Sequence, residues 1–341
     1  MKRLLTVLLA LLLLCSQAFA ITAEDFVVSD QVDDTDKYYF YARMLISDMT
    51  LEEKAAQLFA VPADVWREDM RAGGVMITGK SIVSEAQLKQ KTQSMQLAAG
   101  EIPLFVMAEE EGGYVSRIAM KLGYDAAAPY GEVAQNKDYE SAYLSAYAIG
   151  IYLAGLGINV NLAPSCELKA NTQEDLIPMR YAGTDERVVS GMAVQTVKGL
   201  NDAGITAGVK HFTGSGMQVF KDAKDAGAGI VVVSATDESV YDPGIACAFS
   251  PVVCENLLRE EVKFEGVVMT SLLSIAGAKD ASGQAVMAIK AGCDMILMPG
   301  SYDEALDAVL DAVRNGDITE ERINYSVQRI VALKIMAGLI D

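Results

Sequence analysis

The chain has 341 residues, of which 51% are hydrophobic and 22% are charged, and its formal net charge is −18 at pH 7. This composition excludes an intrinsically disordered chain, and so acidic a surface repels nucleic acid and anionic membranes. We therefore expect a globular protein, built as one large domain or as two ordinary ones, that has no nucleic-acid partner.

The N-terminus predicts a secretory signal peptide over residues 1–20. Lys2-Arg3 precede an apolar run, Leu4–Leu14, and Gln17-Ala18-Phe19-Ala20 form an A-x-A-type cleavage site. The alternative is a membrane anchor, but the apolar run is too short to span a bilayer comfortably. We expect cleavage near Ala20, no membrane insertion afterwards, and a protein that is secreted or lies in the periplasm or cell envelope.

After the signal peptide, residues 21–40 are polar and acidic and are expected to form a lead-in. Residues 41–341 alternate between short apolar runs and helix-like segments. Thr50-Leu51-Glu52-Glu53 has the pattern of a helix capping box. Eight apolar runs end in polar or Gly-rich residues: Gln57–Val61, Gly74–Ile77, Leu104–Ala108, Ile158–Ala163, Thr206–His211, Ile230–Ser234, Gly266–Thr270 and Met295–Pro299.

Helix-like segments lie between these runs, among them Glu140–Leu156, Glu186–Ala203, Ser250–Val262 and Asp303–Arg314. Ala203-Gly204 and Ala291-Gly292 look like helix C-caps placed just before strands. Short buried strands that alternate with helices predict a parallel sheet. Eight such units predict a single (β/α)8 barrel. A doubly wound open sheet remains the alternative, because the hydrophobic pattern does not distinguish a closed sheet from an open one.

Polar side chains gather at the expected C-terminal ends of the strands, where barrels carry their chemistry. Three glutamates that begin at Glu109 follow the third run, and Glu167 follows the fourth. Arg180 stands ahead of a helix, and Lys210 and His211 end the fifth run. Such a rim suits a ligand rich in hydroxyl groups, because carboxylates accept hydrogen bonds while Arg and Lys donate them. A network of salt bridges at the rim is the alternative interpretation.

Six motifs follow one another at Met49–Gln57, Gly73–Ile77, Pro103–Arg117, Gly157–Pro164, Arg180–Asp185 and Lys210–Gly216. In this order they resemble the patterns of family 3 glycoside hydrolases, among them P-L-x-x-x-x-D-x-E-G-G-x-V-x-R and K-H-F-P-G-H-G. The chain is most similar to the single-domain β-N-acetylglucosaminidase branch. The resemblance implies a barrel domain over residues 41–341 and a β-N-acetylhexosaminidase type of activity. Its saccharide partner would be a β-linked amino sugar or a peptidoglycan fragment.

The same resemblance assigns roles to the rim residues. Arg180, Lys210 and His211 match positions that hold the sugar in the first subsite. Glu109 stands at a position, usually Asp, that binds sugar hydroxyls, and Glu167 also stands where an Asp usually lies. Arg117 ends the motif that begins at Pro103 and is assigned to the same substrate-binding set.

The pattern breaks at the catalytic positions. Gly266–Ser274 resembles the strand that carries the nucleophile, G-V-I-x-S-D-D-L, but the nucleophilic Asp is replaced by Ser271 and the next Asp by Leu272. The proton donor of the resembled branch is a His–Asp pair on a long loop after the fifth strand. Here Gly216 leads through Met217–Val219 directly into a segment that resembles the next helix, so we expect that loop to be deleted.

Because two separate catalytic parts are missing, the sequence predicts a pseudoenzyme: a relative that binds saccharide and hydrolyses it weakly or not at all. A serine hydroxyl is uncharged at neutral pH and has no evident base here. One alternative is an active glycosidase with relocated carboxylates, for instance Glu110, Glu111 or Asp280. The other is a barrel with a purely structural or protein-interaction role.

Four cysteines follow the signal peptide: Cys166, Cys247, Cys254 and Cys293. None has metal-ligand spacing and His211 is the single histidine of the chain, so we expect neither a metal nor another cofactor. Export permits disulfides. Cys247 and Cys254 either pair with each other or stay buried as free thiols.

Overall fold

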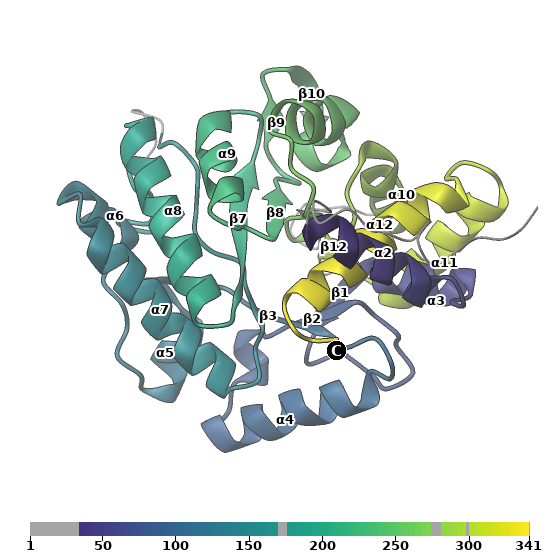
Figure 1. Ribbon diagram of the computed structural model, residues 1–341, viewed down its shortest axis with the longest axis horizontal. Coiled ribbons are helices and arrows are strands. Elements are labelled where there is room, and N and C mark those ends of the chain that lie inside the picture. Colours follow the sequence, from purple (N-terminus) through teal and green to yellow (C-terminus); the bar gives the residue numbers. More distant parts are fainter. Residues whose placement is uncertain (1–33, 170–175, 274–280, 298–299, 341) are drawn as a thin grey trace, which may run out of the picture.

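The computed structural model describes residues 34–169, 176–273, 281–297 and 300–340 (Figure 1). Its main sheet has eight strands, all paired in parallel. Each predicted apolar run holds one of them: β1 (Phe59–Pro62), β2 (Gly74–Met76), β3 (Phe105–Ala108), β6 (Val160–Asn161), β7 (Thr206–Phe212), β8 (Ile230–Val233), β11 (Val267–Thr270) and β12 (Ile296–Leu297). The run that was expected to reach Pro299 ends outside the described residues.

The sheet closes into a barrel. The strands lie side by side in the order β11-β8-β7-β6-β3-β2-β1-β12, so that neighbours in the chain are neighbours in space. The two end strands meet at a parallel bridge between Met269 and Met295, where the Thr270 amide donates to the Met295 carbonyl at 3.0 Å. The predicted (β/α)8 barrel is therefore confirmed, and the open doubly wound sheet is excluded.

Helices surround the barrel (Figure 1). They are α2 (Asp34–Ile46), α3 (Leu51–Gln57), α4 (Glu85–Ala98), α5 (Arg117–Leu122), α6 (Tyr130–Gln135), α7 (Tyr139–Gly155), α8 (Glu186–Asp202), α9 (Met217–Asp225), the π-helix η4 (Val252–Glu261), α10 (Ala281–Ala291), α11 (Tyr302–Arg314) and α12 (Glu320–Met336). Short 3-10 turns are η2 (Gly79–Ser81) and η3 (Cys247–Phe249). Two antiparallel hairpins, β4 (Glu110–Gly112) with β5 (Val115–Ser116) and β9 (Glu238–Ser239) with β10 (Asp242–Ala246), leave the barrel after β3 and β8.

Local signals in the sequence set several of these boundaries. The Thr50 hydroxyl accepts from the Glu53 amide and the Glu53 carboxylate accepts from the Thr50 amide, so the predicted capping box opens α3. Gly204 and Gly292 follow α8 and α10 with φ of 78° and 117°, a region that favours glycine. The two helices therefore stop where the sequence predicts, just before β7 and β12.

Two hydrophobic layers hold the fold together. One fills the barrel and includes Phe105, Met107, Met269 and Met295, while the other lies between the strands and the helices. Ile330 and Leu333 reach from α12 into the barrel layer, so α12 covers the N-terminal ends of the strands. Strands buried on both faces explain why the sequence shows continuous apolar runs and no alternation.

Residues 34–40 of the predicted lead-in are helical, because α2 begins at Asp34, while residues 21–33 lie outside the described residues. This helix packs along α12 (Figure 1), where the Gln328 amide group donates to the Tyr39 carbonyl at 2.9 Å. Ala42 and Ile46 are buried in the outer core. The acidic composition of residues 21–40 gave no sign in the sequence that α2 has this buried apolar face.

The four cysteines of the barrel are free and buried, including Cys247 and Cys254, which were considered as a pair. The thiol of Cys254 lies 3.8 Å from the thiol of Cys293, a residue 39 positions later in the sequence. Across the described ranges, no group of His, Cys, Asp and Glu side chains has the arrangement of a metal site. None of the helices in those ranges has both the length and the apolarity needed to cross a membrane.

Candidate functional site

A buried charge network lies at the C-terminal ends of β3 and β7. Lys210 extends from β7 with its side chain 1% exposed, and its ammonium contacts the carboxylates of Glu109 and Glu111, the latter at 2.7 Å. Arg180 donates two parallel hydrogen bonds, each 2.9 Å long, to the Glu111 carboxylate. Such a bidentate pair fixes both the position and the orientation of the guanidinium group.

The electrostatics of this network keep all four groups ionised. Burial favours the neutral form of Glu111, but Lys210 and Arg180 outweigh burial and lower the pKa of Glu111 to about 2. Burial likewise opposes the charge on Lys210, while its two carboxylate partners raise its pKa overall. The charge on Lys210 lowers the pKa of Glu109. The site therefore presents fixed charges at any physiological pH.

Glu109 and Glu110 point in different directions although they are adjacent. Glu109 lines the cavity at the barrel mouth, where Arg117 lies 3.9 Å from its carboxylate. Glu110 is 1% exposed and accepts hydrogen bonds from the Ile118 amide and, at 2.9 Å, from the Tyr152 hydroxyl. Burial raises the pKa of Glu110. Glu110 thus anchors α5 and α7 and does not face the mouth.

The single histidine is held by a carboxylate. His211 Nδ1 lies 3.2 Å from Glu167, and the Ser165 hydroxyl donates to the other Glu167 oxygen at 2.6 Å. Burial raises the pKa of Glu167, but its contact with His211, the Ser165 hydrogen bond and the charge of Arg180 together outweigh burial, so the net shift is downward. His211 lines the cavity, whereas Glu167 stands behind it and orients the ring.

Ser271 directly follows β11, on the side of the mouth opposite β3. Its hydroxyl accepts from the Ala235 amide at 2.8 Å, which ties it to the end of β8. Thr236 and Leu272 lie beside it along the same cavity. Glu109 is the one carboxylate among the described residues that line the cavity, so none of these lining carboxylates lies beside Ser271.

The connection from β7 to α9 consists of residues 213–216, and α9 begins at Met217. Hairpin β9–β10 packs against this connection. A Cβ on Gly214 would lie 3.0 Å from the Ser239 hydroxyl and 3.1 Å from the Tyr241 ring. The structure therefore agrees with the short connection that the sequence predicts, and no acid–base pair extends from it.

The mouth cavity has a volume of about 400 Å³. It is lined by six of the seven residues predicted for the site: Glu109, Arg117, Arg180, Lys210, His211 and Ser271. The seventh, Glu167, contacts His211. The structure thus brings the predicted residues together, while the sugar contacts assigned to them remain predictions. Of the carboxylates considered as relocated catalytic groups, Asp280 lies outside the described residues.

Glu111 is the functional residue that sequence analysis missed as part of the binding set. The signal was available in the alternation of an extended chain, in which Glu109 and Glu111 share one side and Glu110 takes the other. The run of three glutamates obscured it. Glu111 is 4% exposed and forms ion pairs with both Arg180 and Lys210. It therefore positions these two side chains, although it does not itself line the cavity.

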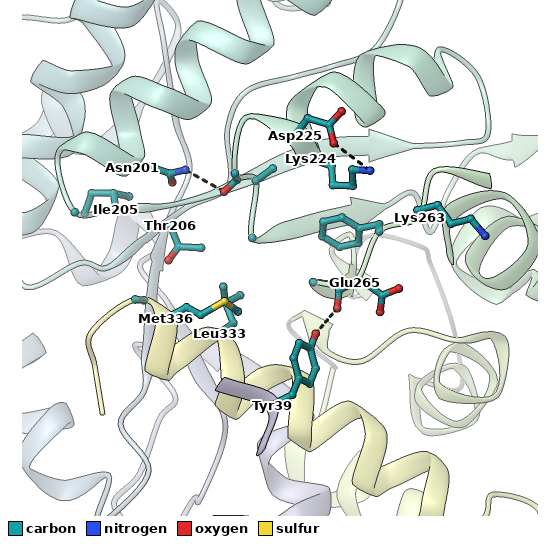
Figure 2. A pocket seen from close by; sticks show the side chains of 17 residues that line it. Tyr39, Asn201, Ile205, Thr206, Lys224, Asp225, Lys263, Glu265, Leu333 and Met336 are labelled. Carbon is teal, nitrogen blue, oxygen red and sulfur yellow. Dashed lines mark hydrogen bonds and ion pairs between the residues drawn. The ribbon is translucent and has the colours of Figure 1, made fainter. Parts of the chain in front are cut away.

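A larger cavity of about 880 Å³ opens at the other end of the barrel (Figure 2). It lies where β7, β8 and β11 begin and is bordered by the end of α12. Its polar groups bond within the protein: Tyr39 donates to the Glu265 carbonyl at 2.6 Å and Asn201 to the Gly227 carbonyl at 3.0 Å. It contains none of the predicted site residues. Since barrel chemistry lies at the C-terminal ends of strands, the smaller mouth cavity is the candidate site.

The sequence model of the Glycosyl hydrolase family 3 N terminal domain matches residues 50–218 and 215–333. The chain belongs to glycosyl hydrolase family 3. This confirms the family that the motifs predict, and the barrel is the fold of that domain. The mouth cavity lies at the end of the barrel that carries three residues of the family motifs, namely Lys210, His211 and Ser271.

Three similar proteins carry names of β-hexosaminidase or β-N-acetylglucosaminidase activity. A "Beta-N-acetylglucosaminidase/beta-glucosidase" of Cellulomonas fimi is 27% identical over 88% of this chain and 60% of that protein. "Beta-hexosaminidase A" of Pseudoalteromonas piscicida is 26% identical over 77% and 53%. The solved family 3 β-N-acetylglucosaminidase of Paenibacillus sp. FPU-7 superposes with a TM-score of 0.76 at 28% identity, over 85% and 63%. The chain thus spans 53% to 63% of the length of these three proteins.

Proposed function

We propose that this family 3 protein binds saccharides of the β-N-acetylhexosamine type and hydrolyses them weakly or not at all. The observation that carries the proposal is the cavity lining, in which Glu109 is the one carboxylate among the described residues. A retaining glycosidase needs a nucleophile and a separate proton donor at the scissile bond, and the nucleophile position here is Ser271. The Glu109 carboxylate also forms an ion pair with the Lys210 ammonium.

The residues that remain suit recognition. Lys210 and Arg180 are held by Glu111 and line the cavity together with Glu109, so donors and an acceptor lie side by side there. Paired donors and acceptors of this kind match vicinal hydroxyls and an acetamido oxygen. Because the charges are already fixed before binding, little ordering is required of the protein when a sugar enters.

We propose that hydrolysis lacks both its nucleophile and its proton donor among the described residues that line this cavity. Ser271 is uncharged and its hydroxyl is engaged by the Ala235 amide, so it cannot stabilise a positively charged sugar ring as a carboxylate does. His211 is oriented by Glu167 on the β6–β7 side, and no base is found beside Ser271 among the described residues that line the cavity. We propose that Glu111 is not a relocated nucleophile, because both its oxygens are taken by Arg180 and Lys210.

We also propose export through the signal peptide over residues 1–20. In that compartment the ligand would be a β-linked amino sugar or a cell-wall fragment. The names of the relatives support the amino-sugar class, and the basic start, apolar run and A-x-A site support export.

The test combines turnover with binding. The purified mature protein is assayed with 4-nitrophenyl β-N-acetylglucosaminide, and N-acetylglucosamine binding is measured by calorimetry. We expect no turnover above that of Arg180→Ala, and binding that Arg180→Ala weakens at least tenfold, since a buried bidentate charge contact is lost. Arg314→Ala, an exposed arginine on α11, is the matched control and should bind normally.

Turnover that disappears in Arg180→Ala would show an active glycosidase and overturn the non-hydrolytic proposal. Absence of saccharide binding by a folded protein would favour a structural or protein-interaction role.

A further inference from the structure

Tyr114 stands at the rim of the mouth cavity, in the turn of hairpin β4–β5. This turn lies close against the segment between α5 and α6: the Gly113 amide donates to the Ala127 carbonyl at 2.9 Å, and a Cβ on Gly113 would lie 2.8 Å from the Pro129 Cα. Gly112 and Gly113 have φ of 94° and 53°, in the region that favours glycine. The backbone that carries Tyr114 is therefore held in place by packing that glycine permits.

The Tyr114 ring is open to solvent. It is 67% exposed although it lines the cavity, and within the described ranges its hydroxyl has no hydrogen-bond partner and its ring has no aromatic neighbour. It is also the one Phe, Tyr or Trp among the described residues of the lining. A tyrosine ring on a fixed backbone offers a large contact surface at a low cost in conformational entropy, because it has few rotatable bonds.

Two aliphatic side chains continue this apolar part of the rim. Val115 follows Tyr114 on β5, Ile177 precedes Arg180 in the chain, and both are partly buried and line the mouth cavity. Tyr114, Val115 and Ile177 also border a second, small hollow, so Ile177 lies beside the hairpin. The charged groups lie deeper, since the side chains of Lys210 and Arg180 are 1% and 18% exposed. The cavity thus has charges in its depth and an apolar surface at this part of its rim.

The hairpin also stands in a particular direction from Ser271, which occupies the nucleophile position of the family motif. Hairpin β4–β5 leaves the barrel after β3, and Ser271 follows β11. Four steps separate β3 from β11 in the order of the eight strands, so the two lie across the mouth from each other. In a retaining glycosidase the nucleophile and the leaving group are on opposite faces of the sugar ring. With the anomeric carbon beside Ser271, a β-linked substituent therefore projects away from Ser271 and towards the hairpin.

The Tyr114 ring suits a second sugar ring at this place. The face of a tyrosine ring is electron-rich, and the axial C–H bonds of a β-linked hexosamine carry a small positive charge, so the two rings attract each other face to face. The hydroxyl groups of the sugar point sideways and stay in water, so the contact leaves no polar group buried without a partner. A methyl group in place of the second ring offers no such face.

We infer that the cavity takes a β-linked saccharide of at least two amino-sugar rings and that Tyr114 determines this preference. One ring contacts the charged residues in the depth of the cavity, and the second ring stacks on Tyr114, flanked by Val115 and Ile177. The cavity volume of about 400 Å³ lies in the range of clefts that hold ligands of this size. This inference rests on the proposed saccharide-binding function and specifies its ligand class.

The test compares methyl β-N-acetylglucosaminide with N,N′-diacetylchitobiose, which carries a second ring in place of the methyl group, by calorimetry with the full mature protein. We expect the disaccharide to bind roughly fivefold more tightly, because one stacking contact with an aromatic ring is gained. Tyr114→Ala should remove most of that advantage and leave the affinity for the methyl glycoside nearly unchanged, whereas Tyr114→Phe, which keeps the ring, should retain it. Tyr325→Ala, at a tyrosine on α12 that is 50% exposed, is the matched control and should change neither affinity.

The outcomes separate the two proposals. If neither ligand binds, saccharide binding itself fails and the inference falls with it. If both bind equally, or if Tyr114→Ala keeps the preference for the disaccharide, saccharide binding stands and the two-ring inference is overturned. The same holds if Tyr114→Ala weakens both ligands alike while circular dichroism shows a native fold.

Two further variants guard against artefacts. If Tyr114→Ala does not fold, Tyr114→Leu provides the same comparison, because it keeps an apolar side chain and removes the aromatic face. Disaccharide binding that persists unchanged in Arg180→Ala would place the ligand outside the mouth cavity and would also overturn the inference.

Discussion

At the scale of single residues, the site depends on a carboxylate that its ligand need not touch. Glu111 is buried, and it holds Arg180 by two hydrogen bonds and Lys210 by a third contact. Removing any one of these charges would leave the others buried and incompletely paired, which costs several kcal/mol. The network is therefore a rigid platform that is complete before a ligand arrives.

Lys334 is a second buried lysine, and it has no charged partner among its described contacts. It lies near the end of α12, with no exposed surface, 2.8 Å from the Gln57 side-chain oxygen and 5.1 Å from the centre of the Phe105 ring. Burial lowers the pKa of Lys334 to about 7, from an ordinary value near 10.5. The folded state thus releases a proton that the unfolded chain retains.

Replacing Lys334→Met should stabilise the protein at pH 7 by on the order of 3 kcal/mol, because it removes this penalty while filling the same volume. Between pH 7 and 10.5 the unfolded chain binds more protons than the folded one, so the stability of the wild type rises with pH. The advantage of Lys334→Met should therefore be largest at or below pH 7 and shrink towards pH 10. Urea unfolding at several pH values measures it, with Lys198→Met on the exposed side of α8 as the control. An advantage that grows with pH would contradict the prediction.

Ser271→Asp places a carboxylate at the position that the family motif gives to the nucleophile. A carboxylate at this position can attack a sugar whose leaving group needs no protonation, but it supplies no general acid. We expect slow turnover of 2,4-dinitrophenyl β-N-acetylglucosaminide, well above the wild type, and none of the methyl glycoside. Ser271→Asn is the matched control, since it has the same shape without the charge. Equal turnover by both variants would rule out the proposed role of the position.

At the scale of elements, the connections after the strands define the cavity more than the strands do. Residues 213–216 lead from β7 straight into α9, and hairpin β9–β10 packs over them. The connection on that side is therefore four residues long and carries no acid–base pair. Hairpin β4–β5 has the opposite effect, because it turns Glu109 and Glu111 towards Lys210 while Glu110 faces α5 and α7.

The capping box that opens α3 offers a direct test of a local signal. Thr50→Ala removes the acceptor for the Glu53 amide and should cost about 1 kcal/mol of unfolding free energy. Thr50→Ser keeps the hydroxyl and should cost less than half as much. Chemical denaturation of the three proteins gives the comparison. An equal loss in both variants would mean that the Thr50 methyl group, and not the cap, is responsible.

At the scale of the whole molecule, charge opposes the compact state. A net charge of −18 on a single barrel produces self-repulsion that salt can screen. The screening length falls from about 30 Å at 0.01 M salt to about 8 Å at 0.15 M. We expect the melting temperature at pH 7 to rise by a few degrees over this range of sodium chloride. The control is the same series near pH 4.5, the isoelectric point, where the rise should vanish. A melting temperature that falls with salt at pH 7 would show that attractive surface pairs dominate.

Much of the fold could be predicted because its signals are local. The strands are continuous apolar runs, since both faces of each strand are buried, and capping residues such as Thr50 and Gly204 mark where helices begin and end. The start of α2 could not be predicted, because Ala42 and Ile46 become a buried face only when α12 lies beside them.

For the candidate site, the sequence by itself determined which chemical groups are available: the charged residues of the rim, the serine at Ser271 and a single histidine. It determined this because identity and order along the chain need no tertiary information. Only the tertiary structure decided how these groups are divided, because pairing depends on which strand ends adjoin. Closure of the barrel placed β11 beside β12, so that Leu272 and Leu297 line the same cavity. The fold also placed Glu111 between Arg180 and Lys210, which fixes the positions of these two charged side chains.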